Sequence, residues 1–321
     1  MTKMIKINKW FPKEIVEIYR KEIVSKVIEK NDNNSEFAFL KWENREYKVG
    51  IDDLLTSSLE ELRKKDGIAL YIHLCQENKI PECISKDIRK IINYDTLSGK
   101  WNGRLRHKLM SSLGLTTCPY CNRQYITDYI DENGDDKSTA DLDHFYPKNY
   151  YPLFALSLFN FIPSCQVCNS RMKLDKWKDI LYPHDEGFDD KVKFCLKPKD
   201  HNEKDLLKSW LGDSEVIDNL QIDFEFCENL DKEFKKRAEG SIELFRLKQV
   251  YDIHKAKALD IVLKQRIYLE GSYKEYMSTL MKDLSLSCTD EDIINILVGY
   301  HWQDENYDEP LSKLVHDIFC K

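Results

Sequence analysis

Apolar residues in the first third of the chain mostly recur at helical spacing. Within residues 11–30 they fall on every fourth position, at Ile15, Tyr19, Ile23 and Val27. This period predicts an amphipathic helix that buries one face against the rest of the protein. Other segments with a clear pattern are helical at 58–78, 84–93 and 102–113 and β-like at 37–42 and 47–51.

The last third of the chain is also dominated by helical patterns. After residue 191, one β-like stretch at 220–226 precedes charged helical patterns at about 232–248, 251–285 and 289–300. Glycines and a serine between residues 93 and 103 suggest a joint before the middle of the chain. We therefore predict a mostly helical α+β protein with an N-terminal region at 1–100, a central domain at 101–190 and a C-terminal region at 191–321.

Composition narrows the class of protein. The chain has 321 residues, 42% of them hydrophobic, a net charge of -7 and a pI of about 5.7. It has no run of about 18 uncharged apolar residues, and its start, MTKMIKINKW, lacks the apolar centre of a signal peptide. We therefore expect a globular cytoplasmic protein without a membrane partner. The acidic balance argues against nonspecific coating of nucleic acid, although a local basic patch occurs at Arg104, Arg106, His107 and Lys108.

Four of the ten cysteines form two C-x-x-C pairs, Cys118 with Cys121 and Cys165 with Cys168. In a chain without a secretion signal, such pairs are more typical of metal sites than of disulfides. Each pair directs two thiolates at one centre, and Zn²⁺ takes four of them in a closed structural site. The sequence therefore predicts a structural zinc ion. The segment between the pairs, 122–164, exceeds the usual zinc-ribbon spacing, so a folded insert is expected there.

The insert carries polar residues suited to catalysis. It contains LDHFYPK, with Asp143 and His144, and then N-x-x-P-x-C-x-x-C-N, which begins at Asn160 and ends at Asn169. An Asp-His pair alone is usually a surface turn, and an Asn before a helix is usually an N-cap. Together with the two C-x-x-C pairs, one of them CPYC, the set resembles the HNH (ββα-metal) endonucleases in their H-N-N form. The resemblance covers about residues 116–183.

This resemblance implies a β-hairpin followed by a helix around one divalent cation, embedded in the helical protein. The strands are expected within Tyr125–Phe145 and the helix at Gln166–Lys176. Neighbouring residues of a strand point to opposite faces. Asp143 and His144 can therefore serve one site only where their strand ends or bulges.

The resemblance also implies a role for each polar residue. Asp143 and Asn169 would bind the catalytic metal, and His144 would be the general base that deprotonates the attacking water. Asn160 would brace the loop that aims His144. One carboxylate and one amide leave positions for water and phosphate oxygens, which suits Mg²⁺ or Mn²⁺. Because Cys168 adjoins Asn169, the zinc ion should fix the start of the helix that presents Asn169.

Three basic residues are candidates for contacts to the substrate backbone. Lys173, four residues after Asn169, would either neutralise a phosphate or lie on the exposed face of its helix, and the sequence favours neither. Lys148 and Arg123 are the other two candidates.

The wider pattern, in which helical regions flank such a core, resembles PtuB-like HNH proteins of the Septu and retron anti-phage systems. That resemblance implies an ATPase partner, and the chain has no G-x-x-x-x-G-K-[ST] motif of its own. DNA is the favoured substrate. The alternatives are an RNase, for example one that cleaves tRNA, a zinc module that binds nucleic acid without catalysis, and a restriction enzyme resembling McrA-type proteins.

Overall fold

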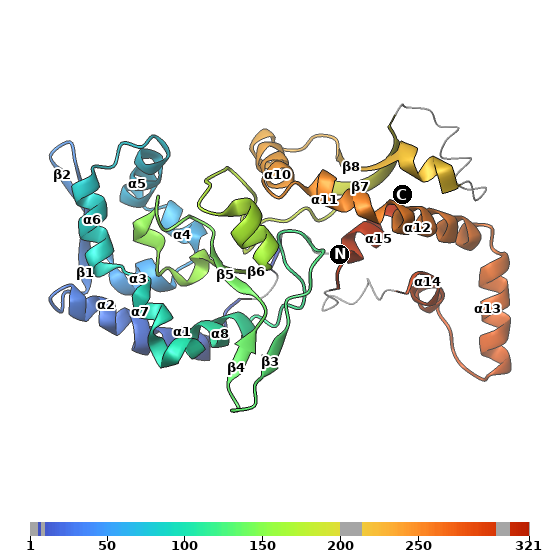
Figure 1. The fold of residues 1–321 in the computed structure, drawn as a ribbon, viewed down its shortest axis with the longest axis horizontal. Coiled ribbons are helices and arrows are strands. Elements are labelled where there is room, and N and C mark those ends of the chain that lie inside the picture. The colour runs from blue at the N-terminus through green and yellow to red at the C-terminus, as the bar shows by residue number, and fades with distance from the viewer. Residues whose placement is uncertain (1–5, 8–9, 200–213, 300–308, 321) are drawn as a thin grey trace.

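The computed structural model describes residues 6–7, 10–199, 214–299 and 309–320. About half of these residues lie in helices, and the strands pair into small antiparallel sheets of two strands each. The predicted α+β class is therefore confirmed. Figure 1 shows the N-terminal helices at one end of the molecule, the C-terminal helices at the other, and strands β5 and β6 between them.

The N-terminal region begins with the predicted amphipathic helix. It comprises α1 (Lys13–Tyr19), a π-helical turn (Arg20–Val24) and α2 (Ser25–Lys30). Its periodic face is buried, as the spacing required. The two β-like stretches pair as the hairpin of β1 (Glu36–Trp42) and β2 (Arg45–Gly50).

Six short helices complete this region: α3 (Ile51–Thr56), α4 (Leu59–Arg63), α5 (Asp66–Gln76), α6 (Glu82–Ile91), α7 (Asp95–Ser98) and α8 (Arg104–Ser111). The single helix expected at 58–78 is divided because Lys65 takes an extended conformation. Ile51 starts a helix where the sequence suggested the end of a strand.

The central segment contains two hairpins. β3 (Asp128–Ile130) pairs with β4 (Asp136–Ser138), and β5 (Asp141–His144) pairs with β6 (Phe161–Ser164). A π-helical segment, Val167–Lys173, follows β6. Three strands, β3, β4 and β5, lie within the expected range 125–145, and β5 pairs with β6, a buried apolar strand beyond that range.

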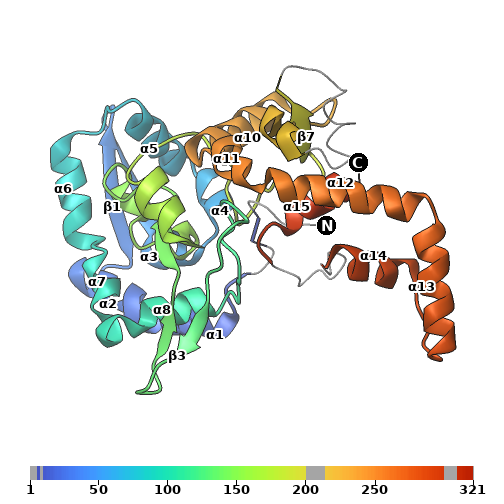
Figure 2. The same cartoon turned by 45° about the vertical axis from the view of Figure 1, so that its right-hand side comes forward.

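The C-terminal region contains a hairpin of β7 (Val192–Pro198) and β8 (Leu220–Phe226); β7 was not predicted. The helices that follow are α10 (Lys232–Leu244), α11 (Leu247–Tyr251), α12 (Lys255–Leu269), α13 (Ser272–Asp283), α14 (Asp290–Val298) and α15 (Ser312–Phe319). The helix expected at 251–285 is broken at Gly271, whose φ of 82° ends α12. Helix α15, also not predicted, contacts both α12 and β7, and Figure 2 shows it beside α12.

The buried apolar side chains of the three predicted regions form one connected core. Polar contacts join the regions as well. Tyr19 donates its hydroxyl hydrogen to the Leu156 carbonyl at 2.6 Å, and Tyr251 donates to the Cys121 carbonyl at 2.6 Å. The central segment is therefore held from both sides, and the boundaries at residues 100 and 190 stay predictions.

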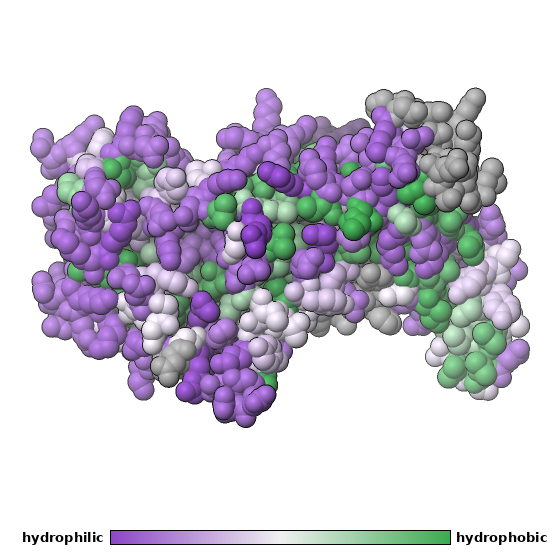
Figure 3. Space-filling model, viewed as in Figure 1, coloured by the Kyte–Doolittle hydropathy of each residue, from purple (hydrophilic) through white to green (hydrophobic). Residues whose placement is uncertain are grey.

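Apolar side chains are also exposed on and after α13, where Figure 3 shows a hydrophobic area on an otherwise largely hydrophilic face. The exposed residues there are Tyr276, Leu280, Leu284 and Leu286. In the part of the chain that the structure describes, every helix is too short or too polar to cross a membrane.

The close approach of α10 to the central segment gives a test of the packing. A Cβ at Gly240 would lie 2.0 Å from the Asp179 carbonyl oxygen. Alanine normally stabilises a helix interior over glycine by about 1 kcal/mol. Here we expect Gly240→Ala to lower the free energy of unfolding by roughly 1–3 kcal/mol, because the backbone must shift. Thermal unfolding would be compared with that of Glu239→Ala, an exposed neighbour; an unchanged or higher Tm for Gly240→Ala would contradict the expectation.

Candidate active site

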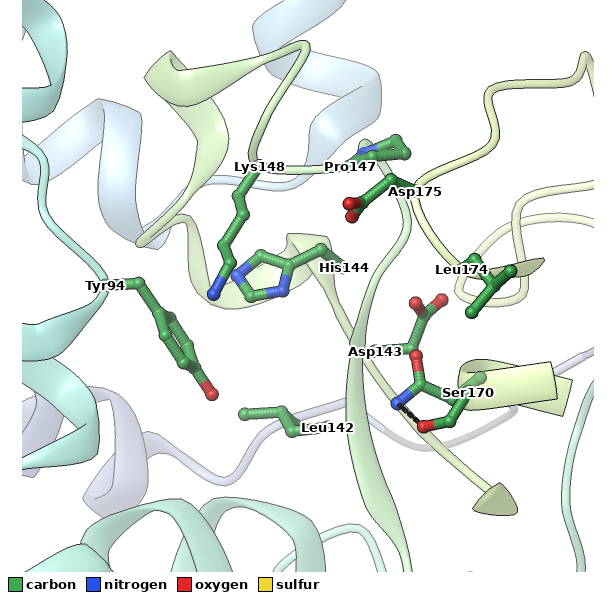
Figure 4. Close-up of a pocket in the computed structure, with 10 residues that line it drawn as sticks. Tyr94, Leu142, Asp143, His144, Pro147, Lys148, Ser170, Leu174 and Asp175 are labelled. Atoms are coloured by element: carbon green, nitrogen blue, oxygen red, sulfur yellow. Dashed lines mark hydrogen bonds between the residues drawn. The ribbon is translucent and has the colours of Figure 1, made fainter. Parts of the chain in front are cut away.

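A hollow of about 300 Å³ opens beside the end of β5. Figure 4 shows His144 and Lys148 on one side of it and Asp143, Ser170 and Leu174 on the other. Asp143 and His144 both line it because the strand ends at His144, which meets the condition that strand geometry imposes on the pair. The full lining is Tyr94, Leu142, Asp143, His144, Pro147, Lys148, Asn169, Ser170, Leu174 and Asp175.

The His144 imidazole is held by one hydrogen bond and two aromatic rings. Its Nε2 lies 3.1 Å from the Ala155 carbonyl oxygen, and Tyr94 and Phe161 pack edge-on at 4.7 and 5.2 Å between ring centroids. A carbonyl only accepts, so Nε2 carries the proton and Nδ1 of the neutral ring keeps its lone pair. Burial lowers the pKa of His144 to about 3. The ring is therefore neutral at pH 7, as a general base requires.

Asp143 is 3% exposed, and both of its carboxylate oxygens have partners. Oδ1 lies 3.0 Å from Lys173 Nζ, and Oδ2 accepts a 2.6 Å hydrogen bond from the Tyr120 hydroxyl. Burial raises the pKa of Tyr120 well above its usual value, so the phenol keeps its proton and donates. These contacts fix the carboxylate at the edge of the hollow.

Lys173 occupies neither of its two expected positions. It is 1% exposed, and besides Asp143 its ammonium donates to the His144 carbonyl at 2.6 Å. A buried ammonium needs such partners because an unpaired charge is costly to bury. The side chain therefore supports the backbone at Asp143 and His144, and it faces neither solvent nor the lining of the hollow.

Asn169 lines the same hollow from the first turn of the π-helical segment. Its Nδ2 donates to Asp141 Oδ2 at 3.1 Å, and Ser170 Oγ donates to the same oxygen. Because the amide nitrogen is directed at Asp141, the carbonyl oxygen is the group that Asn169 offers to a cation. Asp143 and Asn169 thus bring one carboxylate and one amide oxygen to one hollow, a donor set that fits Mg²⁺ or Mn²⁺.

Asn160 is fully buried and holds the loop between β5 and β6. Its Oδ1 accepts from the Tyr146 amide at 2.8 Å, and its Nδ2 donates to the carbonyls of Tyr146 and Phe154 at 3.1 and 3.0 Å. The residue next to Phe154 is Ala155, whose carbonyl accepts from His144. The structure therefore places Asn160 where it can brace His144 from a distance.

We expect Asn160→Ala to destabilise the protein by about 3 kcal/mol or more, since it leaves buried backbone groups unpaired. Chemical denaturation of the variant and of Asn133→Ala, an exposed asparagine in the β3–β4 turn, would measure the difference. Equal midpoints for the two variants would show that the bonds made by Asn160 contribute little.

The four cysteines of the two C-x-x-C pairs form one buried cluster, with all Sγ atoms within 4.8 Å of one another. A tetrahedral Zn²⁺ with bonds of about 2.3 Å needs sulfur atoms roughly 3.8 Å apart. Hydrogen bonding to Cys118 lowers the pKa of Cys165, while burial raises that of Cys118. The cluster can therefore hold a metal ion such as zinc, and the sequence prediction of these four residues agrees with their placement.

The turn after Cys121 ties the cluster to the C-terminal helix. Asn122 is buried with a φ of 44°. Its Oδ1 accepts from the Lys313 amide at 3.1 Å, and its carbonyl accepts from the Leu311 amide at 2.7 Å. The next residue, Arg123, is half-buried near Tyr251 and His254 and is not part of the lining of the hollow.

Lys148 and Tyr94 form the wall of the hollow opposite Asp143. The Lys148 ammonium lies 4.3 Å from the centroid of the Tyr94 ring, and Arg106 from α8 hydrogen-bonds the Tyr94 phenol, which opposes the rise in its pKa caused by burial. Arg104, at the other end of the basic patch 104–108, instead forms an ion pair with Asp135 at 2.9 Å. Sequence reasoning missed Tyr94, which lies far from the motif and carries no local signal.

Comparison with known proteins gives one distant relative. Protein ea31 of Escherichia phage lambda is 26% identical over 167 residues, which cover 50% of this chain and 48% of the relative. The chain thus spans about half the length of that relative, whose name states no activity. No protein-family model and no solved structure matches the chain.

Proposed function

We propose that this protein is a metal-dependent endonuclease of the HNH type that hydrolyses phosphodiester bonds, with DNA as the first candidate substrate. The observation that carries the proposal is the meeting of His144, Asp143 and Asn169 at one hollow, with an unprotonated Nδ1 on the histidine. A zinc module that only binds nucleic acid has no use for this set.

Each residue at the hollow would have its own role in phosphodiester hydrolysis. His144 Nδ1 takes a proton from the water that attacks phosphorus, and the Ala155 carbonyl stabilises the proton on Nε2 as positive charge develops on the ring. Asp143 and Asn169 would hold Mg²⁺ or Mn²⁺. When bound, such an ion supplies a Lewis acid for the phosphate and for the leaving oxygen. Lys173 and Tyr120 hold the Asp143 carboxylate in its orientation.

The four-cysteine cluster would hold a structural zinc ion next to this site. Cys168 and Asn169 are adjacent, so the thiolate cluster fixes the turn from which the Asn169 amide reaches the hollow. The zinc would act on catalysis through geometry alone.

The proposed setting is bacterial anti-phage defence together with an ATPase partner. It rests on the resemblance in sequence and on the absence of a P-loop motif from the chain. The same core could act on RNA, because nothing in the hollow as described identifies a sugar.

The first experiment is cleavage of supercoiled plasmid, linear duplex, single-stranded DNA and total tRNA by the zinc-loaded protein, with and without the copurified partner. We expect cutting with Mg²⁺ or Mn²⁺ and none after EDTA. The EDTA treatment would be brief, so that the zinc held by the four thiolates is retained. Adding back Mg²⁺ alone should then restore cutting, which separates the catalytic ion from the structural one. No cutting of any substrate, with or without the partner, would reject the nuclease and favour the binding module.

A further inference from the structure

A second hollow, of about 250 Å³, adjoins the first and shares Tyr94 and Lys148 with it. It extends away from His144 toward Asn93, Asp95 and Arg89. Ala155, whose carbonyl accepts from His144, also lines it. The two hollows therefore meet at the wall that positions the proposed general base.

Lys148 stands at the boundary of the two hollows, with its ammonium over the Tyr94 ring. When the scissile phosphate of a nucleic acid strand lies beside His144, the next phosphate along the strand lies on one side of the hollow or the other. If it lies on the Tyr94 side, the Lys148 ammonium is the cation that pairs with it. The nucleotide attached to that phosphate then reaches the second hollow.

The second hollow has charges of both signs in its lining, with Arg89 and Lys148 as well as Asp95. Asp95 contributes a carboxylate, which repels an anion, and the Arg89 guanidinium is already engaged by Glu82 and the Asn149 carbonyl. Ile92 and Pro152 add apolar surface. Apolar walls with one carboxylate acceptor fit a nucleobase that carries an amino group, because an aspartate accepts from the exocyclic amine of cytosine or adenine.

We propose that this hollow, the Asp95 subsite, receives one unpaired base next to the scissile phosphate, and that the preferred substrate is therefore single-stranded at the cut. The volume of about 250 Å³ gives room for one base. A base enters such a pocket only when it leaves the duplex stack, which is least costly in a single strand. This inference rests on the proposed nuclease function.

The test compares single-stranded oligonucleotides of mixed sequence with the same sequences in duplexes, using zinc-loaded protein and Mg²⁺. We expect faster cleavage of the single strands and cut sites enriched next to cytosine or adenine over thymine. Asp95→Ala should reduce this preference about tenfold, since alanine removes the carboxylate that accepts from the amine. Asp283→Ala, at an exposed aspartate on α13, is the matched control.

A binding measurement separates the proposed Asp95 subsite from the proposed nuclease activity on which it rests. Fluorescence anisotropy with zinc-loaded His144→Ala protein would compare oligoadenosine with oligothymidine, and Asp95→Ala in that background should remove any difference. His144-dependent cleavage with equal rates on single strands and duplexes, or a base preference unmoved by Asp95→Ala, would overturn the subsite and leave the nuclease standing. No cleavage and no binding would overturn both.

Discussion

Replacing His144 with alanine is expected to reduce metal-dependent cleavage by about 10²–10⁴-fold, the range contributed by a positioned general base. The imidazole lies at the end of β5 with Nε2 committed to Ala155 and Nδ1 open to the hollow. With its pKa lowered by burial to about 3, the ring is unprotonated at neutral pH. Single-turnover cleavage at saturating Mg²⁺ measures the chemical step directly.

The control is His73→Ala, at an exposed position on α5 whose imidazole is remote from the motif. Circular dichroism and thermal unfolding of both variants would show that the folds are retained. Loss of activity in both would indicate a general effect of the substitutions, and full activity of His144→Ala would remove the histidine from the mechanism.

Removing the metal from the four-cysteine cluster is expected to have the second large effect. Structural zinc binding contributes on the order of 10 kcal/mol in small zinc domains, and that contribution is lost when the four cysteines take up protons in place of the ion. Cys168→Ser, or extraction of zinc by a chelator, should therefore disorder residues 165–173 and with them Asn169. Activity should fall to background even with excess Mg²⁺.

The same treatment should loosen α15, although that helix contributes no ligand to the cluster. Asn122 joins the knuckle to the amides of Leu311 and Lys313, so hydrogen exchange in 312–319 should accelerate when zinc is removed. Cys83→Ser, at an exposed thiol on α6, serves as the control. Retained protection of α15 in zinc-free protein would show that the helix is anchored without the knuckle.

Local periodicity accounts for what could be predicted of the fold. The helix at 13–30 and the β1–β2 hairpin were found because their patterns are complete within a short window. The pairing of β5 with β6 could not be found in this way, because it depends on which apolar strand packs against residues 141–144 across an intervening loop. β7 carried a usable signal, because Val192, Phe194 and Leu196 alternate with lysines and a cysteine and are buried.

For the candidate site, sequence reasoning found the residues grouped by spacing and missed those grouped by folding. The cysteines and Asp143, His144 and Asn169 belong to one short segment. Tyr94 reaches the hollow from the N-terminal region through tertiary packing alone. Lys173 shows a different limit: its position in the motif was visible, but only the packed structure shows a buried ammonium paired with Asp143.

The link between Asn122 and α15 also bears on the order of synthesis. A ribosome delivers all four cysteines and both strands of the β5–β6 hairpin long before residues 311–313 emerge. Until then the buried amide of Asn122 lacks the backbone groups that it pairs with in the finished molecule. A nascent chain thus receives the four cysteines and the β5–β6 hairpin well before the backbone groups of residues 311–313 that support the turn after Cys121.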